Sequence, residues 1–320
     1  MIEFIAMLLI GLLMLSKGSD FSVDNASALA KKLGVSAIVI GLTVVALGTS
    51  MPELFVSFYA ALSGKPDIAI GNIIGSNIAN IGLILGLAAL IAPMAIKEKT
   101  IAKEMPIMIA ASIAFILLGL MAVPAGAETM LSRIDGLLLL VLFAYFMVYI
   151  MHSVKSEPDA VKKEFEKEIH AKKQPALTLL FFTMGGIAVV VIGANIFVEG
   201  SVGLARIFGI SEEFIGLTLV AIGTSLPELF VSVRAAMKKE ADIAVGNIVG
   251  SNIFNILFIL GISSFISPIK VSATFLSDSA IMLAFAIALM ALTMHNKSLS
   301  KGKGILLLAG YTAFVWLAMA

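Results

Sequence analysis

Long apolar runs, separated by short polar breaks, make up almost the whole chain. Each run is about as long as the roughly 20 residues that an α-helix needs to cross the hydrocarbon core of a bilayer. Charged residues, or proline and glycine, separate nearly all of the runs. The pattern therefore predicts an all-α membrane protein of ten transmembrane helices. Their expected ranges are 2–24, 36–62, 68–92, 105–124, 134–151, 176–199, 212–236, 243–267, 276–294 and 303–319.

The composition favours a membrane protein over a soluble domain. Hydrophobic residues make up 60% of the 320 residues, and charged residues only 13%, a balance typical of chains that lie in a bilayer. The chain has no cysteine, which excludes disulfides and thiolate metal sites. The first apolar run contains Glu3 but no basic cluster and no small-residue cleavage site. We therefore expect a membrane helix there and not a removed signal peptide.

Lysine and arginine fall mainly on one side of the ten predicted helices. Most of the 22 such residues lie in breaks expected on a single face, and the positive-inside rule assigns that face to the cytoplasm. We therefore predict a multi-pass protein of the cell membrane with both termini extracellular. The segment of mixed charge that begins near His152 is predicted to be a cytoplasmic connector over 152–175. It would join a first half at 1–151 to a second half at 176–320.

Two segments of the first half return almost unchanged in the second half. Gly41–Ser57 reappears as Gly216–Ser232, and Asp67–Asn80 reappears as Asp242–Asn255, both after 175 positions. Each half then holds five predicted helices, and an odd number forces the second half to cross the membrane upside down. The expected architecture is two inverted five-helix repeats, which are typical of secondary transporters.

The first repeated segment places a glutamate directly after a proline inside an apolar run, as Glu53 and as Glu228. A carboxylate at the bilayer centre is unfavourable by about 2.5–3.5 kcal/mol on insertion scales. Proline has no N–H and clashes with the carbonyl four residues back, so we expect helices 2 and 7 to be broken here. Free carbonyls are expected around residues 46–48. Non-helical backbone at this depth lines a cavity or holds a ligand.

The second repeated segment adds a polar helix face to each half. Side chains spaced four residues apart share that face, namely Asn72, Ser76 and Asn80 in one copy and Asn247, Ser251 and Asn255 in the other. A neighbouring glycine stripe permits close helix approach, at Gly71, Gly75, Gly246 and Gly250. Carboxylates, hydroxyls and amide oxygens are ligands of hard cations such as Ca²⁺. Two glutamates match one divalent ion or several monovalent ions, and without a cation at least one should hold a proton.

Several of these polar side chains have a structural alternative as hydrogen-bonding groups between helices. It stays open for Thr49, Thr224, Ser76 and Ser251, and it is favoured for Asn72 and Asn247. Two other function classes also use buried carboxylates, namely a passive cation channel and an intramembrane enzyme with an acid and a base. The enzyme is disfavoured because the sequence pairs no nucleophile with a base, and we predict a protein that is not an enzyme.

The two motif pairs carry a family resemblance. Gly-Thr-Ser-Met-Pro-Glu53 with Gly-Asn-Ile-Ile-Gly-Ser-Asn77, and Gly-Thr-Ser-Leu-Pro-Glu228 with Gly-Asn-Ile-Val-Gly-Ser-Asn252, resemble the two alpha-repeats of the Ca²⁺/cation antiporter superfamily. Within it the chain is most similar to prokaryotic sodium/calcium exchangers, over all ten predicted helices. The proton/calcium branch usually has Gly-Asn-Ala-x-Glu in place of Gly-Thr-Ser-x-Pro-Glu, which favours sodium as the counter-ion.

The resemblance implies a set of ion ligands. A central calcium site would be formed by Glu53, Glu228, Thr49 and Thr224. Sodium ions would lie beside Ser50, Ser76, Ser225 and Ser251 and the carbonyls of Ala46 and Ala221. Asn80 and Asn255 would lie at the middle of the site. Some archaeal relatives have Asp where this chain has Asn255, so the site here is more symmetric and has one carboxylate fewer.

The resemblance also implies alternating access. Helices 1 and 6 would slide over a core of helices 2, 3, 7 and 8, and Ca²⁺ or Na⁺ must neutralise the glutamates before that step. The expected function is antiport of Na⁺ against Ca²⁺, with Ca²⁺ exported; the alternative is a Ca²⁺/H⁺ antiporter. The expected partners are these two ions and the lipid bilayer, with no nucleic acid, no obligatory protein partner and no cofactor apart from the transported ions.

Overall fold

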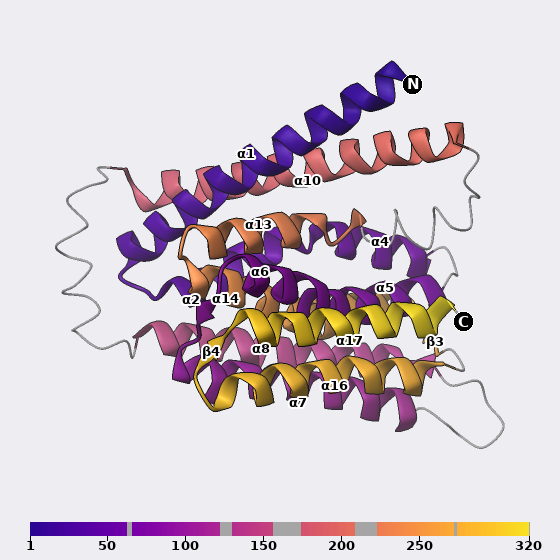
Figure 1. Ribbon diagram of the computed structural model, residues 1–320. Helices are drawn as coiled ribbons and strands as arrows, with labels where there is room; N and C mark the ends of the chain where they lie inside the picture. The colour runs from indigo at the N-terminus through magenta and orange to yellow at the C-terminus, as the bar shows by residue number, and fades with distance from the viewer. Residues whose placement is uncertain (63–65, 122–129, 156–173, 209–222, 272–273, 320) are drawn as a thin grey trace. The chain divides into compact units, whose positions relative to one another are not determined.

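A computed structural model describes residues 1–62, 66–121, 130–155, 174–208, 223–271 and 274–319, and nearly all of them lie in helices (Figure 1). The chain forms two compact units, and each draws on both ends of the sequence. Unit 1 comprises Met1–Pro52 and Glu157–Asn247, and unit 2 comprises Glu53–Ser156 and Ile248–Ala320. The expected connector, 152–175, lies mostly outside the described residues, so the boundaries of the two repeats stay a prediction.

Unit 1 is built around two long helices, α1 (Ile2–Leu33) and α10 (Ala176–Ile207). Both extend well beyond the expected ends at 24 and 199, because residues of the added turns, such as Ala26, Leu29 and Ala205, are buried by packing inside the fold. Helix α1 ends at Leu33, and the φ of +63° at Gly34 directly after it is the left-handed conformation common at helix C-termini. The other elements are α2 (Ala37–Ile40), the π-helix η1 (Gly41–Val45), α3 (Ala46–Thr49), α13 (Leu226–Met237) and the first part of α14 (Ala241–Ile253).

Glycines hold α1 and α10 side by side (Figure 1). A Cβ added to Gly11 would lie 2.8 Å from the Gly193 carbonyl oxygen, and one added to Gly18 would lie 3.0 Å from that of Gly186. Gly186 lies 175 positions after Gly11, and Gly193 lies 175 positions after Gly18. The contact therefore pairs Gly11 with Gly193 and Gly18 with Gly186, and the 175-residue repeat converts one pair into the other, as in an isologous interface. The missing side chains of these glycines permit the close approach of the two helices.

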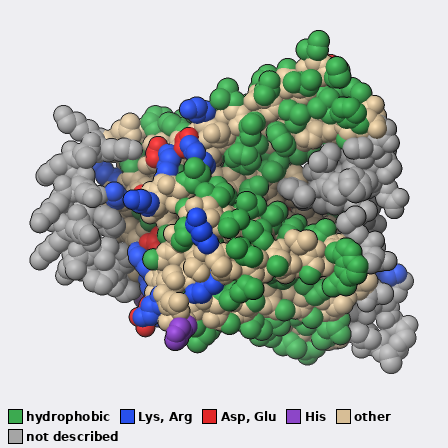
Figure 2. Space-filling model, viewed as in Figure 1, with side chains coloured by type: hydrophobic (Ala, Val, Ile, Leu, Met, Phe, Trp, Pro, Cys, Tyr) green, Lys and Arg blue, Asp and Glu red, His purple; other side chains and the backbone are tan. Residues whose placement is uncertain are grey.

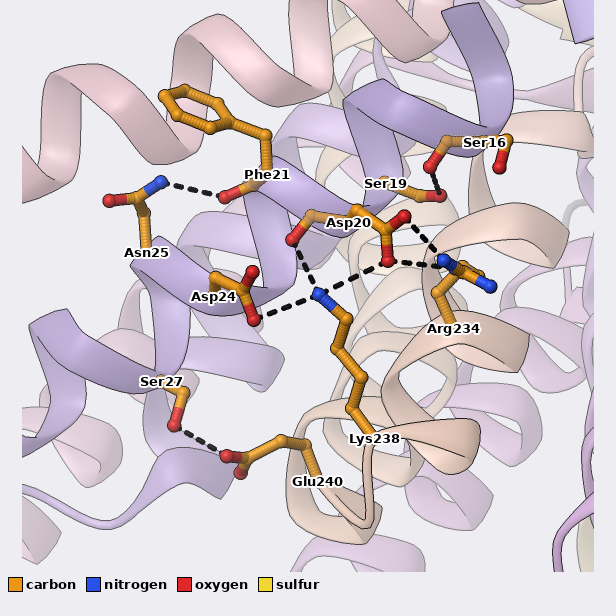
Figure 3. Close-up of polar contacts among 10 residues, drawn as sticks. All are labelled: Ser16, Ser19, Asp20, Phe21, Asp24, Asn25, Ser27, Arg234, Lys238 and Glu240. Atoms are coloured by element: carbon orange, nitrogen blue, oxygen red, sulfur yellow. Dashed lines mark hydrogen bonds and ion pairs between the residues drawn. The ribbon is translucent and has the colours of Figure 1, made fainter. Parts of the chain in front are cut away.

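A charged cluster joins α1 to α13 (Figure 3). The Asp20 carboxylate accepts hydrogen bonds from both Nε and Nη2 of Arg234, the first at 2.9 Å. Lys238 Nζ lies 3.1 Å from Asp20 Oδ1 and 2.8 Å from Asp24 Oδ1. One turn further along α1, Ser27 Oγ donates to Glu240 Oε1 at 2.6 Å. These polar contacts fix the C-terminal half of α1 against α13 and the segment that follows it.

Unit 2 contains the remaining helices and two short antiparallel ladders. The helices are α4 (Met51–Leu62) from Glu53 on, α5 (Pro66–Ala79), η2 (Asn80–Leu85), α6 (Gly86–Ile91), η3 (Thr100–Glu104), α7 (Met105–Met121), α8 (Arg133–Lys155), η5 (Phe254–Ile259), α15 (Leu260–Ile266), α16 (Phe275–Met294) and α17 (Lys301–Met319). Strand β1 (Met94–Ala95) pairs with β4 (Ser298–Leu299), and β2 (Met130–Leu131) pairs with β3 (Ile269–Lys270).

The helices of unit 2 pack in pairs that are distant in sequence. Helix α17 lies against α6 and η2, α8 lies against α15 and η5, and α7 lies against α16. In the last of these interfaces Phe115 meets Phe275 edge to face at 5.0 Å between ring centroids. The helices that carry the second repeated segment thus receive a neighbour from the other half of the chain.

Seven described helices are long and apolar enough to cross a membrane, and the bent pair Ala37–Thr49 and Met51–Leu62 would make eight. Hydrophobic side chains cover long stretches of the visible surface, apart from patches of Lys and Arg (Figure 2). Exposed Leu177, Phe181 and Trp316 are examples, and such side chains suit a lipid environment. Residues 212–222 of the expected seventh helix lie outside the described residues, so the count of ten stays a prediction.

Candidate ion-binding site

The first repeated segment bends at Ser50. Helix α3 ends at Thr49, Ser50 has φ −81° and ψ 9°, and the helices on either side of it are inclined by 48°. Pro52 has no N–H, so the Gly48 carbonyl lacks its usual partner four residues on. The expected break of helix 2 is confirmed. Ser225, its repeat equivalent, has φ −88° and ψ 3° at the start of α13, and the earlier part of helix 7 lies outside the described residues.

The carbonyls before the bend are less free than expected. Ser50 N donates to the Ala46 carbonyl at 3.0 Å, because the chain stays helical as far as Thr49. The expectation of a released carbonyl at Ala46 is therefore wrong, although a carbonyl oxygen can accept a second bond. Its repeat equivalent Ala221 lies outside the described residues.

Unit 1 brings the first motif's hydroxyls to residues of the second half. Ser50 Oγ donates to Glu228 Oε1 at 3.0 Å, and Thr49 Oγ1 lies 3.0 Å from Asn247 Oδ1. All four side chains are buried, and Glu228 is 0% exposed. A buried carboxylate is unfavourable unless a proton, a cation or hydrogen bonds compensate it, so this is a place where positive charge is favoured.

Glycine contact lets these segments meet. A Cβ added to Gly41 would lie 3.1 Å from the Gly246 Cα and 3.0 Å from the Ile243 carbonyl. The expected role of Gly246, close approach to a broken helix, is confirmed in unit 1. For Gly71 and Gly75 an added Cβ would meet no described atom within 4 Å.

Unit 2 holds the other glutamate beside the second motif of its own half. Glu53 is 1% exposed, and Ser76 Oγ lies 3.4 Å from its Oε1. Asn72 Nδ2 donates to the Glu53 backbone carbonyl at 3.3 Å and to Ser57 Oγ at 2.9 Å. In unit 1 Asn247 Nδ2 donates to Ser232 Oγ at 3.0 Å, the same contact 175 positions later. Asn72 and Asn247 thus act as structural groups, as the sequence favoured, with Ser57 and Ser232 as partners that it did not single out.

Four asparagines of unit 2 form a second polar group. Asn80 Nδ2 donates to Asn252 Oδ1 at 2.9 Å, and Asn255 Nδ2 donates to Asn77 Oδ1 at 2.9 Å. All four are at most 2% exposed. Asn80 and Asn255 were expected at the site, whereas Asn77 and Asn252, the last residues of the two Gly-Ser-Asn motifs, were given no role from the sequence.

The remaining candidates are placed but not joined into one site. Ser225 and Ser251 are buried, and Thr224 is half-buried in the turn before α13. Glu228 belongs to unit 1 and Glu53 to unit 2, and their convergence stays a prediction. No cluster of three or more His, Cys, Asp or Glu side chains that could hold a metal occurs among the described residues.

Comparison with known proteins gives consistent matches over most of the chain. The family described as sodium/calcium exchanger protein matches residues 3–152 and 178–320. The sodium/calcium exchanger MaX1 of Methanosarcina acetivorans is 37% identical over 340 residues, with 96% of each chain covered. A solved structure of the sodium-calcium exchanger NCX_Mj has a TM-score of 0.82 at 34% identity, covering 98% of this chain and 97% of that one. The Ca²⁺/H⁺ antiporter ChaA of Bacillus subtilis is 27% identical over 273 residues, 81% of this chain and 77% of its own.

Proposed function

This chain belongs to the sodium/calcium exchanger family and is a multi-pass membrane antiporter of Ca²⁺, and from that premise we propose that Na⁺ is its counter-ion and that Glu53 and Glu228 share the exchanged ions. The contact that carries this proposal is the one between Ser50 and Glu228. It joins a hydroxyl of the first motif to the carboxylate of the second, and Glu53 follows Ser50 by three residues in the chain.

The proposed ligands are the two negatively charged glutamates and a set of neutral oxygens. Thr49 and Thr224 complete a Ca²⁺ site with the glutamates, and Ser50, Ser76, Ser225 and Ser251 with the carbonyls of Ala46 and Ala221 serve Na⁺. Asn80 and Asn255 lie at the middle. Oxygen ligands of this kind suit hard cations. The exchanged ions are substrates, and the carboxylates act as ligands rather than as an acid and a base.

Charge supplies the coupling in this proposal. One Ca²⁺ or several Na⁺ would neutralise two buried carboxylates, whereas an empty and ionised pair would have to cross an apolar barrier. Conversion between outward-open and inward-open states is then favoured only with ions bound, which makes exchange obligatory. With a sodium gradient directed inward, the physiological direction is Ca²⁺ export across the cell membrane.

Partner exchange between repeat-equivalent residues supports the inverted-repeat architecture. It occurs at Gly11 and Gly18 with Gly186 and Gly193, and again within the four asparagines. We propose ten helices in repeats at 1–151 and 176–320, with a cytoplasmic connector at 152–175 and extracellular termini. In this arrangement α1 and α10 are the sliding helices of alternating access.

Calcium flux in proteoliposomes tests the counter-ion. Purified protein is reconstituted, and ⁴⁵Ca²⁺ uptake is measured with an outward Na⁺ gradient at clamped pH, with a K⁺ gradient, and with a pH gradient without Na⁺. We expect uptake only with the Na⁺ gradient. Uptake that follows the pH gradient and ignores Na⁺ would assign the chain to Ca²⁺/H⁺ exchange, which the similarity to ChaA makes the second candidate. Flux that needs no counter-ion would indicate a channel.

A further inference from the structure

The four buried asparagines are oriented by groups that can only accept hydrogen bonds. Asn77 Nδ2 lies 3.3 Å from the Asn252 carbonyl and 3.6 Å from the sulfur of Met282. Asn252 Nδ2 lies 3.3 Å from the Asn77 carbonyl and 3.6 Å from the sulfur of Met108. A carbonyl and a thioether offer no proton, so both amides must turn their NH₂ groups toward them.

This orientation determines that of Asn80 and Asn255. With their NH₂ groups engaged, Asn77 and Asn252 present their Oδ1 atoms to the other pair, and these atoms accept from Asn255 Nδ2 and Asn80 Nδ2 at 2.9 Å. Asn80 and Asn255 must therefore point their own Oδ1 atoms the other way. The assignment of oxygen and nitrogen follows from backbone carbonyls and not from a free choice of amide flip.

The Oδ1 atoms of Asn80 and Asn255 have no hydrogen-bond partner among the described residues. Asn80 is 1% exposed and Asn255 is 0% exposed. A buried acceptor without a partner is destabilising, and here the same unfavourable feature occurs twice at repeat-equivalent positions. Both residues also lie in π-helical segments, η2 and η5, and such segments are frequent at functional sites. These oxygens are therefore available to a cation or to a hydrogen-bond donor.

We propose that Asn77 and Asn252 are positioning residues for ion binding. They hold the Asn80 and Asn255 amides so that only carbonyl oxygens, and no NH₂ group, face the transported cation. The inference rests on the proposed function, because it assigns Asn80 and Asn255 to the site. A flipped amide would direct its partial positive charge at the ion, so the orientation itself contributes to cation affinity.

Cation-induced thermal stabilisation tests this role in the full chain. Detergent-solubilised wild type and the variants Asn77→Leu and Asn252→Leu are melted without Na⁺ and Ca²⁺, and then in a titration of NaCl with choline chloride as the ionic-strength control. We expect the Na⁺ concentration for half-maximal stabilisation to rise roughly tenfold in each variant. The same increase is expected in the Na⁺ dependence of ⁴⁵Ca²⁺ exchange.

A matched control separates orientation from general loss of a buried amide. Asn25→Leu removes an asparagine on α1 whose side-chain hydrogen-bond partner among the described residues is the Phe21 carbonyl, and this variant should leave the Na⁺ titration unchanged. Asn252→Asp keeps an oxygen that accepts from Asn80, so it should retain the Na⁺ response within about threefold. If the leucine variants do not fold, the Na⁺ response of Asn252→Asp still tests the inference.

The outcomes separate this inference from the proposed function. Leucine variants that melt lower without ions but titrate like wild type would show that Asn77 and Asn252 only hold helices together. Loss of the Na⁺ response in Asn252→Asp would likewise overturn the inference. If wild type itself is stabilised by neither ion and shows no exchange, the proposed function fails first.

Discussion

At the scale of single residues, the repeated motifs place each glutamate beside a hydroxyl. Glu228 accepts from Ser50 of the other half, and Glu53 lies near Ser76 of its own half. Both carboxylates are almost fully buried. In a bilayer such groups are retained for a purpose other than stability, which is why we assign them to the ions.

Replacing either glutamate should abolish coupled transport and leave the protein folded. Glu53→Gln and Glu228→Gln keep the shape and remove one negative charge, so the remaining charge no longer matches a divalent ion. We expect Na⁺-driven ⁴⁵Ca²⁺ uptake below about 1% of wild type, because a lost charged ligand changes binding by several kcal/mol. Glu98→Gln, at an exposed carboxylate, is the matched control and should transport normally. Normal transport by either motif variant would refute the assignment.

Asn255→Asp should alter sodium dependence more than stability. The substitution keeps the acceptor oxygen at the middle of the proposed site and adds a carboxylate, which attracts either a proton or a further cation. We expect the Na⁺ concentration for half-maximal ⁴⁵Ca²⁺ exchange to shift by at least about threefold, with a similar melting temperature. An unchanged sodium titration would count against a middle-site role for Asn255.

At the scale of elements, the charged cluster between α1 and α13 is not repeated elsewhere in the sequence. The positions equivalent to Asp20 and Arg234 are Asn195 and Tyr59. The ion pair therefore has no counterpart at the repeat-equivalent positions. The glycine contacts of α1 and α10 are exchanged symmetrically, whereas this cluster is not. It therefore distinguishes the C-terminal half of α1 from the corresponding part of α10.

Asp20→Asn should lower the thermal stability of the solubilised protein. Asp20 has 22% side-chain exposure and accepts from both Arg234 and Lys238, so we expect a loss of about 1–2 kcal/mol. Asp24→Asn removes only one contact of a side chain that is 58% exposed, and the loss should stay below about 0.5 kcal/mol. Melting curves at low and high salt measure both, and equal losses would contradict the role given to Asp20.

An exposed ion pair beside the ladder of β1 and β4 gives a pH-dependent contribution of known sign. Lys297 Nζ lies 2.6 Å from Glu98 Oε2, and its hydrogen bond and charge hold the pKa of Glu98 below its ordinary value of 4.5. The pair therefore stabilises the fold above pH 4.5 and loses this effect as the pH falls through the lower folded pKa.

Melting of wild type and Glu98→Gln between neutral pH and pH 3 measures this contribution. The difference in melting temperature between the two proteins should be small throughout, since both side chains are exposed. It should shrink as the pH falls below 4.5. A difference that grows toward acid pH would contradict the sign.

At the scale of the whole molecule, repeat-equivalent substitutions should have equal effects. Gly11 and Gly186 are equivalent, and an added Cβ would lie 2.7 Å from Phe197 N in one case and 2.8 Å from Ser22 N in the other. We expect Gly11→Ala and Gly186→Ala each to destabilise by about 1–3 kcal/mol. Gly185→Ala is the control, because no described atom lies within 4 Å of its added Cβ. Unequal losses for the equivalent pair would contradict a symmetric contact of α1 and α10.

The sequence alone determined the apolar helices, the repeat and the bend before Pro52. Each can be read along the chain: the length of an apolar run, the missing N–H of proline, and two segments that return almost unchanged after 175 positions. The two buried glutamates could be found in the same way, since a carboxylate in an apolar run stands out without any knowledge of its neighbours. Local periodicity did not give the true ends of α1 and α10, because the added turns are stabilised by tertiary packing of residues such as Ala26, Leu29 and Ala205.

Tertiary structure alone decided which side chains meet. No local pattern shows that Ser50 reaches Glu228, that Asp20 pairs with Arg234, or that Asn77 and Asn252 orient Asn80 and Asn255. Such contacts join residues more than 170 positions apart, and they depend on which helix faces the fold brings together. Helix formation is encoded by neighbours along the chain, whereas the orientation of a buried amide is set by acceptors that only the folded chain supplies.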